Sequence, residues 1–240
     1  MELRYVHTWP TTKQEAFEAQ QAVIPLVKIR ECPGPPETIA AIDTAYGVGG
    51  EMLYASAVVL TFPELKEVER TYHHGKVSFP YIPGLFYYRE GPIIVDTLRK
   101  LKSDPDLLVI DGHGTAHPRC CGIACHIGVA FDRPAVGCAR KLLVGTHMPV
   151  RELKGNYQPV RHRGKEVGLA YRTKDNVKPL YISPGHLCNL EYAREMLVKC
   201  LRGFRMPEPL RLAHLFANKY KRYEEKNRKA GSPIASKQSE

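Results

Sequence analysis

Two short apolar runs, each ending on an aspartate, constrain the fold of this chain more than any other feature. Leu107–Ile110 is a continuous apolar run, typical of a buried strand, and it leads into Asp111 and a glycine turn. Residues 39–42 lead in the same way into Asp43. Open α/β sheets carry their functional groups at the carboxyl ends of such strands. The two runs therefore predict a sheet that brings two carboxylates to one edge, where they can bind a divalent metal. Taken singly, each aspartate is equally compatible with an ordinary acid at a strand end or turn.

The spacing of apolar residues and breakers around these runs predicts an α/β chain. Three strands joined by short turns favour an antiparallel meander, and they are expected at residues 37–43, 53–62 and 66–77. The order that follows is β-α-β, which favours parallel pairing. Its parts are a helix at 84–102, the strand ending at Asp111, a helix at 120–131 and a strand at 135–137.

The remaining pattern is less regular. It predicts a loosely helical segment at 13–29 that Pro25 disturbs, a hairpin of residues 167–171 and 179–182, and helices at 189–202 and 208–223. No internal repeat or domain boundary is evident. We expect a single domain over residues 1–225 and a polar, flexible C-terminal tail over 226–240.

Composition narrows the possible partners and compartments. At 240 residues and 43% hydrophobic content the chain can bury one sizeable core. No apolar run is long enough for a membrane span, and the first residues lack the apolar core of a signal peptide, so we expect a cytoplasmic protein that does not bind membranes. The formal charge of +10 favours a polyanionic partner such as nucleic acid. Basic residues between 151 and 175 fit either a surface along a phosphate backbone or a merely solvated hairpin.

The cysteines admit two interpretations. Cys120, Cys121, Cys125 and His126 form a cluster that suggests zinc, but a second pair of ligands at zinc-finger spacing is missing. If residues 120–131 are helical, Cys121 and Cys125 share one face as small buried groups. The core interpretation is favoured.

Glu90 is a third candidate acid. Phe86, Glu90 and Ile94 are four residues apart and share a helix face that Leu98 and Leu101 continue. A carboxylate inside an apolar stripe is costly unless a metal or cation compensates it. The alternative is a helix rotated so that Glu90 faces solvent.

Together, Asp43, Glu90 and Asp111 indicate more than any one of them alone. Hard oxygen ligands suit Mg²⁺ or Mn²⁺, and these ions support phosphodiester cleavage. Three histidines are candidates for orienting water or protonating a leaving group: His113, His117 and His214. For each histidine alone, a surface residue with no role is the commoner case.

Pro80, Tyr81, Ile82 and Pro83 join a predicted strand to the Glu90 helix. The two prolines stiffen this loop, which would present Tyr81 and Ile82 as a rigid apolar tip. Apolar wedges of this kind unstack bases, and enzymes that act on a base often extrude it. A tightly packed turn is the alternative, and without further context it is the favoured one.

These motifs, in this order, resemble endonuclease V. The resemblance covers roughly residues 5–223. It is carried by Pro80-Tyr81-Ile82-Pro83-Gly84 with Arg89-Glu90, Asp111-Gly112-His113-Gly114 with His117-Pro118-Arg119, Gly122-Ile123-Ala124, Ser183-Pro184-Gly185-His186 and Arg211-Leu212-Ala213-His214.

The resemblance implies a ribonuclease-H-like mixed sheet flanked by helices and a Mg²⁺-dependent DNA repair endonuclease, with Mn²⁺ as a substitute. That family nicks DNA at the second phosphodiester bond 3′ to deoxyinosine and leaves 3′-hydroxyl and 5′-phosphate ends. By resemblance, Asp43, Asp111 and Glu90 are the metal ligands and catalytic acids, and His214 lies near the catalytic centre. Tyr81 is the wedge, and Pro80, Ile82, Pro83, His117 and Arg140 complete the expected DNA-binding set. We expect a monomer.

One position departs from the family pattern. The family commonly has lysine where this chain has Arg140, followed by Lys141. Arginine keeps the charge but contacts phosphate with a planar fork, and Lys141 would take the position if the register shifted. Two rival functions stay open: an inosine-specific endoribonuclease, because no 2′-hydroxyl contact can be read from sequence, and a non-cleaving inosine-binding protein.

Overall fold

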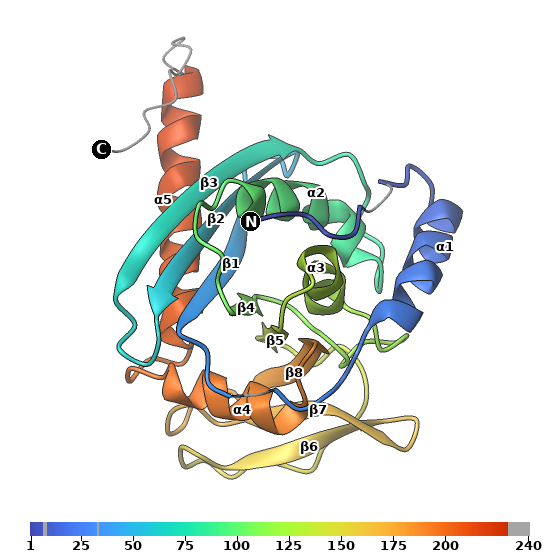
Figure 1. Cartoon of the computed structure of the whole chain (residues 1–240), viewed down its shortest axis with the longest axis vertical. Coiled ribbons are helices and arrows are strands. Elements are labelled where there is room, and N and C mark those ends of the chain that lie inside the picture. The colour runs from blue at the N-terminus through green and yellow to red at the C-terminus, as the bar shows by residue number, and fades with distance from the viewer. Residues whose placement is uncertain (7–8, 33, 230–240) are drawn as a thin grey trace.

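A computed structural model describes residues 1–6, 9–32 and 34–229 (Figure 1). Within these residues the strands form one mixed sheet in the order β3-β2-β1-β4-β5-β8-β7-β6. The strands are β1 Thr38–Tyr46, β2 Met52–Thr61, β3 Glu67–Lys76, β4 Leu107–Ile110, β5 Ala135–Ala139, β6 Tyr157–His162, β7 Lys165–Tyr171 and β8 Leu180–His186. The helices are α1 Lys13–Val23, continued by a 3₁₀ turn at Ile24–Leu26, α2 Phe86–Arg99, α3 Ile123–Phe131, α4 Leu190–Lys199 and α5 Glu208–Lys229. The predicted mixed sheet with flanking helices, of ribonuclease-H-like class, is confirmed.

Most of the predicted pairings are present. Strands β1, β2 and β3 form the antiparallel meander, and β1, β4 and β5 are parallel neighbours. The predicted hairpin is the antiparallel pair β7 and β8. Strand β6 is absent from the sequence prediction, because it lies at the edge of the sheet, most of its residues are polar, and Val160 is its one buried residue. Helix α3 begins at Ile123, three residues later than predicted, after Gly122.

Helices cover both faces of the sheet (Figure 1). Alternate residues of β1 point to opposite sides, as a pleated strand requires. Ala40 and Ile42 pack in one cluster with α2 and α3, whereas Ile39 and Ala41 pack in the other with α4 and α5. The sheet is therefore the middle of three layers, and its centre is buried on both sides.

The cysteine cluster belongs to the core. Cys121 and Cys125 are fully buried and pack with Val23 and Val129 between α1 and α3. The apolar interpretation is confirmed for Cys121 and Cys125 by this burial, whereas Cys120 is exposed.

The parallel register of β1 and β4 places the two aspartates. The paired stretch ends at Ile42 opposite Ile110, so Asp43 and Asp111 follow at the same level of the sheet. Contrary to the prediction, β1 does not end at Asp43, because its antiparallel pairing with β2 continues to Tyr46. Asp43 thus stands inside a strand, held by the β2 ladder, while Asp111 begins a loop.

The loop after Asp111 lies unusually close to the sheet. A Cβ on Gly114 would lie 2.0 Å from the carbonyl oxygen of Pro184 in β8, and a Cβ on Gly137 would lie 2.6 Å from the Gly114 nitrogen. The loop is fixed there by hydrogen bonds from the Gly114 nitrogen to Ser183 Oγ and from the Thr115 nitrogen to the Pro184 carbonyl. Only glycine permits this approach, which holds Asp111 in place.

The structure describes only the first part of the predicted C-terminal tail. Residues 226–229 continue α5, and residues 230–240 of the predicted flexible tail lie outside the described residues. Within the described part, every helix is too short or too polar to cross a bilayer.

We predict that Gly114→Ala destabilises the protein by at least about 2 kcal/mol, because backbone atoms of β8 must move to admit the methyl group. Urea unfolding of the purified variant measures this loss. Gly34→Ala is the control, since nothing lies within 4 Å of its added Cβ, and it should change stability by less than about 0.5 kcal/mol. Equal stability of both variants would contradict the close approach.

Candidate active site

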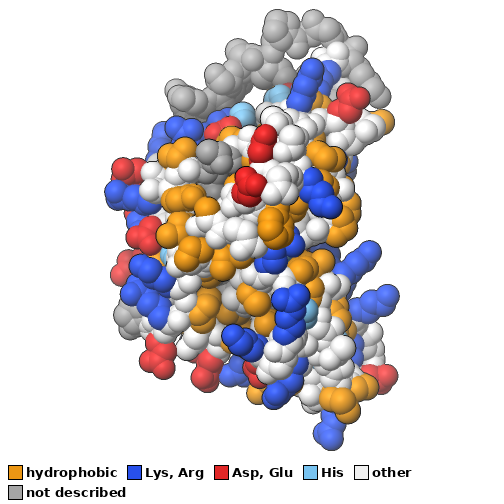
Figure 2. Space-filling view, turned by 90° about the vertical axis from the view of Figure 1, so that its right-hand side faces the viewer, with side chains coloured by type: hydrophobic (Ala, Val, Ile, Leu, Met, Phe, Trp, Pro, Cys, Tyr) orange, Lys and Arg blue, Asp and Glu red, His pale blue; other side chains and the backbone are white. Residues whose placement is uncertain are grey.

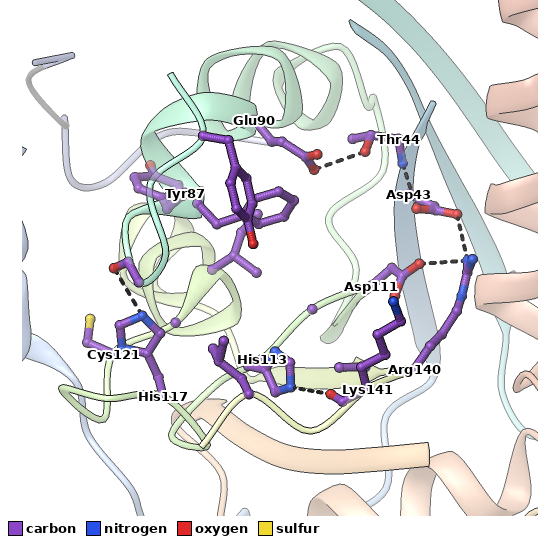
Figure 3. Close-up of a pocket in the computed structure, with 18 of the residues that line it drawn as sticks. Asp43, Thr44, Tyr87, Glu90, Asp111, His113, His117, Cys121, Arg140 and Lys141 are labelled. Carbon is purple, nitrogen blue, oxygen red and sulfur yellow. Dashed lines mark hydrogen bonds and ion pairs between the residues drawn. The ribbon is translucent and has the colours of Figure 1, made fainter. Parts of the chain in front are cut away.

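Most of the predicted site residues line one cleft of about 520 Å³, and Pro80, Ile82 and Pro83 do not (Figure 3). The predicted residues that line it are Asp43, Tyr81, Glu90, Asp111, His113, His117, Arg140 and His214. They come from β1, from the loops after β3, β4 and β5, and from helices α2 and α5. The fold therefore gathers residues that are far apart in the sequence.

Asp43 is held by groups on both of its oxygens. Its Oδ1 accepts a hydrogen bond from the Thr44 nitrogen at 2.7 Å, and its Oδ2 lies 2.7 Å from His214 Nδ1. That hydrogen bond and the negative charge of Asp43 raise the pKa of His214. His214 is thereby favoured as a charged imidazolium donor beside the carboxylate. Helix α5, which packs on β1 and β2, positions it.

Asp111 is paired with Arg140. Arg140 Nη2 lies 2.7 Å from Asp111 Oδ2 and 3.4 Å from Asp43 Oδ2, so one guanidinium bridges the two acids. Burial first, and then the charge of Asp43, raise the pKa of Asp111. Lys141 is used differently: its carbonyl oxygen accepts a hydrogen bond from His113 Nε2 at 3.0 Å. Arg140, not Lys141, is thus the cation at the two carboxylates.

Glu90 points inward from α2 and is only 4% exposed. The Thr44 hydroxyl donates to Glu90 Oε2 at 2.9 Å. Burial raises the pKa of Glu90 to about 7, and the negative charges of Asp43 and Asp111 add to this rise. The inward orientation predicted from helix spacing is confirmed, and the alternative of a solvent-facing Glu90 is wrong.

The donor chemistry of this cluster fits a divalent cation. Burial and nearby negative charge raise the pKa of Glu90 and of Asp111, and a hard cation relieves such repulsion between carboxylates. Among the described residues, no three acidic, histidine or cysteine side chains already stand in a coordinating arrangement. The positive charge between Asp43 and Asp111 is the guanidinium of Arg140.

The loop of residues 80–83 presents one aromatic tip. The Tyr81 side chain is 65% exposed, and Pro80 and Pro83 are exposed beside it. Ile82 instead turns inward and packs against the core, so the prediction of a joint Tyr81 and Ile82 tip is wrong for Ile82. The turn explains this, because the Ile82 carbonyl accepts a hydrogen bond from the Leu85 nitrogen at 2.9 Å as the chain enters α2.

His117 supports the base of that loop. Its Nε2 lies 3.1 Å from the carbonyl oxygen of Gly84, to which Arg119 Nη2 also donates at 2.6 Å. Gln20 of α1 completes the anchor through hydrogen bonds to Gly84 and Arg119. Burial and the nearby Arg119 charge lower the pKa of His117 to about 3, which keeps the imidazole neutral. The predicted DNA contact of His117 stays a prediction.

Sequence reasoning missed three residues that complete the cluster. Thr44 bonds Glu90, Tyr46 lies beside Glu90 and accepts from Arg89 Nε at 2.9 Å, and Gln20 ties α1 to the loop. Thr44 and Tyr46 lie one and three residues after Asp43 in the sequence, so an extension of the predicted strand beyond Asp43 would have included them. Gln20 gave no signal, because its partners are 64 and 101 residues away.

We predict that Glu90→Gln stabilises the metal-free protein at pH 8. Because folding raises the pKa of Glu90 from about 4.5 to about 7, the free energy of unfolding falls as pH rises through that window. The variant lacks this loss, so its advantage should approach about 3 kcal/mol at pH 8 and vanish near pH 4.5. Urea unfolding in EDTA at the two pH values measures it.

The control for that experiment is Glu195→Gln on the surface of α4, which should change stability by less than about 0.5 kcal/mol at either pH. A Glu90→Gln protein less stable than wild type at pH 8 would show that the carboxylate is not under electrostatic stress.

Comparison with known proteins identifies relatives along the same residues. The sequence model of the family Endonuclease V matches residues 22–215. An endonuclease V of Roseiflexus castenholzii is 42% identical over 88% of this chain and 95% of its own length. The crystal structure of endonuclease V from Streptomyces avermitilis superimposes with a TM-score of 0.85, is 33% identical, and covers 90% of this chain and 96% of its own.

A third relative is seen with nucleic acid. Ciona intestinalis endonuclease V, in complex with a 23mer DNA that contains an inosine followed by a ribo-adenosine, is 25% identical, with a TM-score of 0.76 over 88% of this chain and 99% of its own. The match of family, sequence and fold over most of the chain leads to one conclusion: this chain belongs to the endonuclease V family.

Proposed function

We propose that this protein is a Mg²⁺-dependent repair endonuclease that nicks DNA at the second phosphodiester bond 3′ to deoxyinosine and leaves 3′-hydroxyl and 5′-phosphate ends. The observation that carries the proposal is the cluster of Asp43, Glu90 and Asp111 in one cleft, together with an exposed aromatic tip on the loop of residues 80–83. Membership of the endonuclease V family, and the inosine-containing DNA bound by the Ciona relative, support the choice of substrate.

Asp43, Asp111 and Glu90 would hold the metal, with Mn²⁺ as a substitute for Mg²⁺. When bound, such an ion activates water and offsets the negative charge that develops at phosphorus. Asp43 is fixed by Thr44 and His214, so it reaches the cleft in one orientation. The positive charge favoured on His214 places a proton donor beside the reacting groups.

Tyr81 would fill the space of the displaced base. It stands free of the core on a loop stiffened by two prolines and anchored at Gly84, so it can enter a base stack without deforming the fold. Basic side chains suit the phosphates of the DNA: Figure 2 shows Lys and Arg side chains interspersed with apolar side chains on one face. The net charge of +10 acts in the same direction.

Asp43→Ala should reduce nicking of a deoxyinosine duplex in Mg²⁺ by at least about 100-fold, because it removes a carboxylate from the charge-stabilising cluster. A gel assay of an end-labelled duplex measures the rate and maps the cut. Asp104→Ala, which alters an exposed ion pair with Arg133, is the control and should retain activity. Absence of incision by wild type, or unchanged incision by Asp43→Ala, would refute the proposal.

The same assay separates the rival functions. Matched inosine-containing RNA tests the endoribonuclease, which would cut RNA faster than DNA. A non-cleaving inosine-binding protein would bind the duplex in a gel shift and give no product with or without Mg²⁺.

Tyr81→Ala should weaken selective binding to deoxyinosine DNA by about 10-fold, since stacking on one base contributes about 1–3 kcal/mol. Its melting temperature should not change, because the side chain lies outside the core. Tyr223→Ala removes another largely exposed tyrosine, on α5, and should leave binding intact. Competition gel shifts with and without inosine measure the selectivity, and equal effects of the two substitutions would count against the wedge.

A further inference from the structure

Arg140 contacts the carboxylate pair through a single nitrogen. Its Nη2 lies 2.7 Å from Asp111 Oδ2, 3.4 Å from Asp43 Oδ2 and 3.3 Å from His214 Nδ1. A divalent cation shared by Asp43 and Asp111 needs oxygen atoms that this guanidinium now uses. The guanidinium and a metal ion also repel each other at such short range. Arg140 therefore competes with metal for the same two side chains.

The Oδ2 atom of Asp43 has no lone pair free for a second cation while Arg140 stays. It lies 2.7 Å from His214 Nδ1 and 3.4 Å from Arg140 Nη2, whereas Oδ1 accepts from the Thr44 nitrogen. Replacement of the Arg140 guanidinium by a metal ion at Asp43 is consequently simpler than binding of both together. The part that moves is the guanidinium, because the carboxylate is anchored within β1.

The guanidinium of Arg140 can change position while the backbone of Arg140 stays fixed. It directly follows β5, and its carbonyl oxygen accepts a hydrogen bond from Arg205 Nη2 at 3.2 Å. The side chain is 39% exposed and lines the cleft. Within residues 1–6, 9–32 and 34–229, its Nε and Nη1 have no hydrogen-bond acceptor. Those donors suit the oxygens of a phosphate, which a guanidinium binds with two parallel hydrogen bonds.

We propose that Arg140 is an exchangeable counter-ion that yields Asp43 and Asp111 to the metal and moves to a phosphate of the bound nucleic acid. The inference rests on the proposed metal-dependent nuclease function. It makes metal and nucleic acid bind cooperatively. The metal displaces the guanidinium toward the phosphate, and the phosphate draws the guanidinium away from the carboxylates. By linkage, the factor by which DNA tightens metal binding equals the factor by which metal tightens DNA binding.

Manganese binding tests this without any turnover. Free Mn²⁺ is titrated into the full chain and followed by electron paramagnetic resonance, with and without a deoxyinosine duplex whose linkages near the lesion are phosphorothioates, which keep the charge and resist cleavage. Without DNA, Arg140→Gln should bind Mn²⁺ about 10-fold more tightly than wild type. DNA should tighten Mn²⁺ binding about 10-fold in wild type and leave it unchanged in Arg140→Gln.

Two further variants separate this effect from general charge and from misfolding. Lys141→Gln removes the same charge from the same cleft, but among the described residues Lys141 forms no ion pair with either carboxylate, so Mn²⁺ affinity should stay within about 3-fold of wild type. Arg140→Lys keeps the positive charge and should also stay within about 3-fold of wild type.

The possible results separate a failure of the counter-ion role from a failure of the proposed metal-dependent function. Mn²⁺ affinity in Arg140→Gln equal to or weaker than in wild type overturns the counter-ion role alone. An equal gain in Lys141→Gln overturns it too, because the effect would then be one of overall charge. Absence of Mn²⁺ binding in wild type and in every variant overturns both the counter-ion role and the metal-dependent function.

Discussion

The rest of the molecule depends on holding two carboxylates side by side where water is scarce. The parallel register of β1 and β4 fixes Asp43 and Asp111 at one level of the sheet, and Glu90 of α2 adds a third buried acid. Like charges in such a place repel each other and favour protonation. The fold places two basic groups against this, Arg140 from the loop after β5 and His214 from α5, which lie 97 and 171 residues from Asp43 in the sequence. Stability and chemistry therefore oppose each other here, as is common at active sites.

The acids could be singled out because buried strands and helix faces have recognisable apolar patterns in the sequence. A continuous apolar run marks β4, and a four-residue spacing marks the inward face of α2, so local pattern made Asp111 and Glu90 candidates, and the set of three acids with the motif order favoured them. The length of β1 did not follow, because its last three residues are fixed by pairing with β2 and not by their own polarity. Strand β6 was missed for a related reason: an edge strand needs no apolar alternation.

No local sequence pattern indicated the contacts that complete the site. The choice of Arg140 over Lys141 depends on the direction in which the chain leaves β5, one residue after the strand ends. Gln20 reaches Gly84 and Cys121 from a helix outside the sheet. Such contacts arise only when distant elements pack, and the family resemblance named the regions without giving these bonds. The sequence thus indicated the acids, the loop, Arg140 and His214, and the structure supplied the contacts that join them and the Gln20 anchor.

The aromatic tip and the buried acids are connected through the fold. The exposed Tyr81 and the buried Glu90 lie at the two ends of one stretch, a proline-stiffened loop that runs directly into α2. His117 and Arg119 clamp the junction at Gly84, and they belong to the loop that begins with Asp111. Hydrogen bonds at Gly84 therefore connect the loop that carries the tip with the loop that begins at Asp111. A direct connection of this kind limits how far the tip and the acids can move relative to each other, as a preorganised site requires. Arg140, half-exposed at the end of β5, is the member of the cluster left free to adjust.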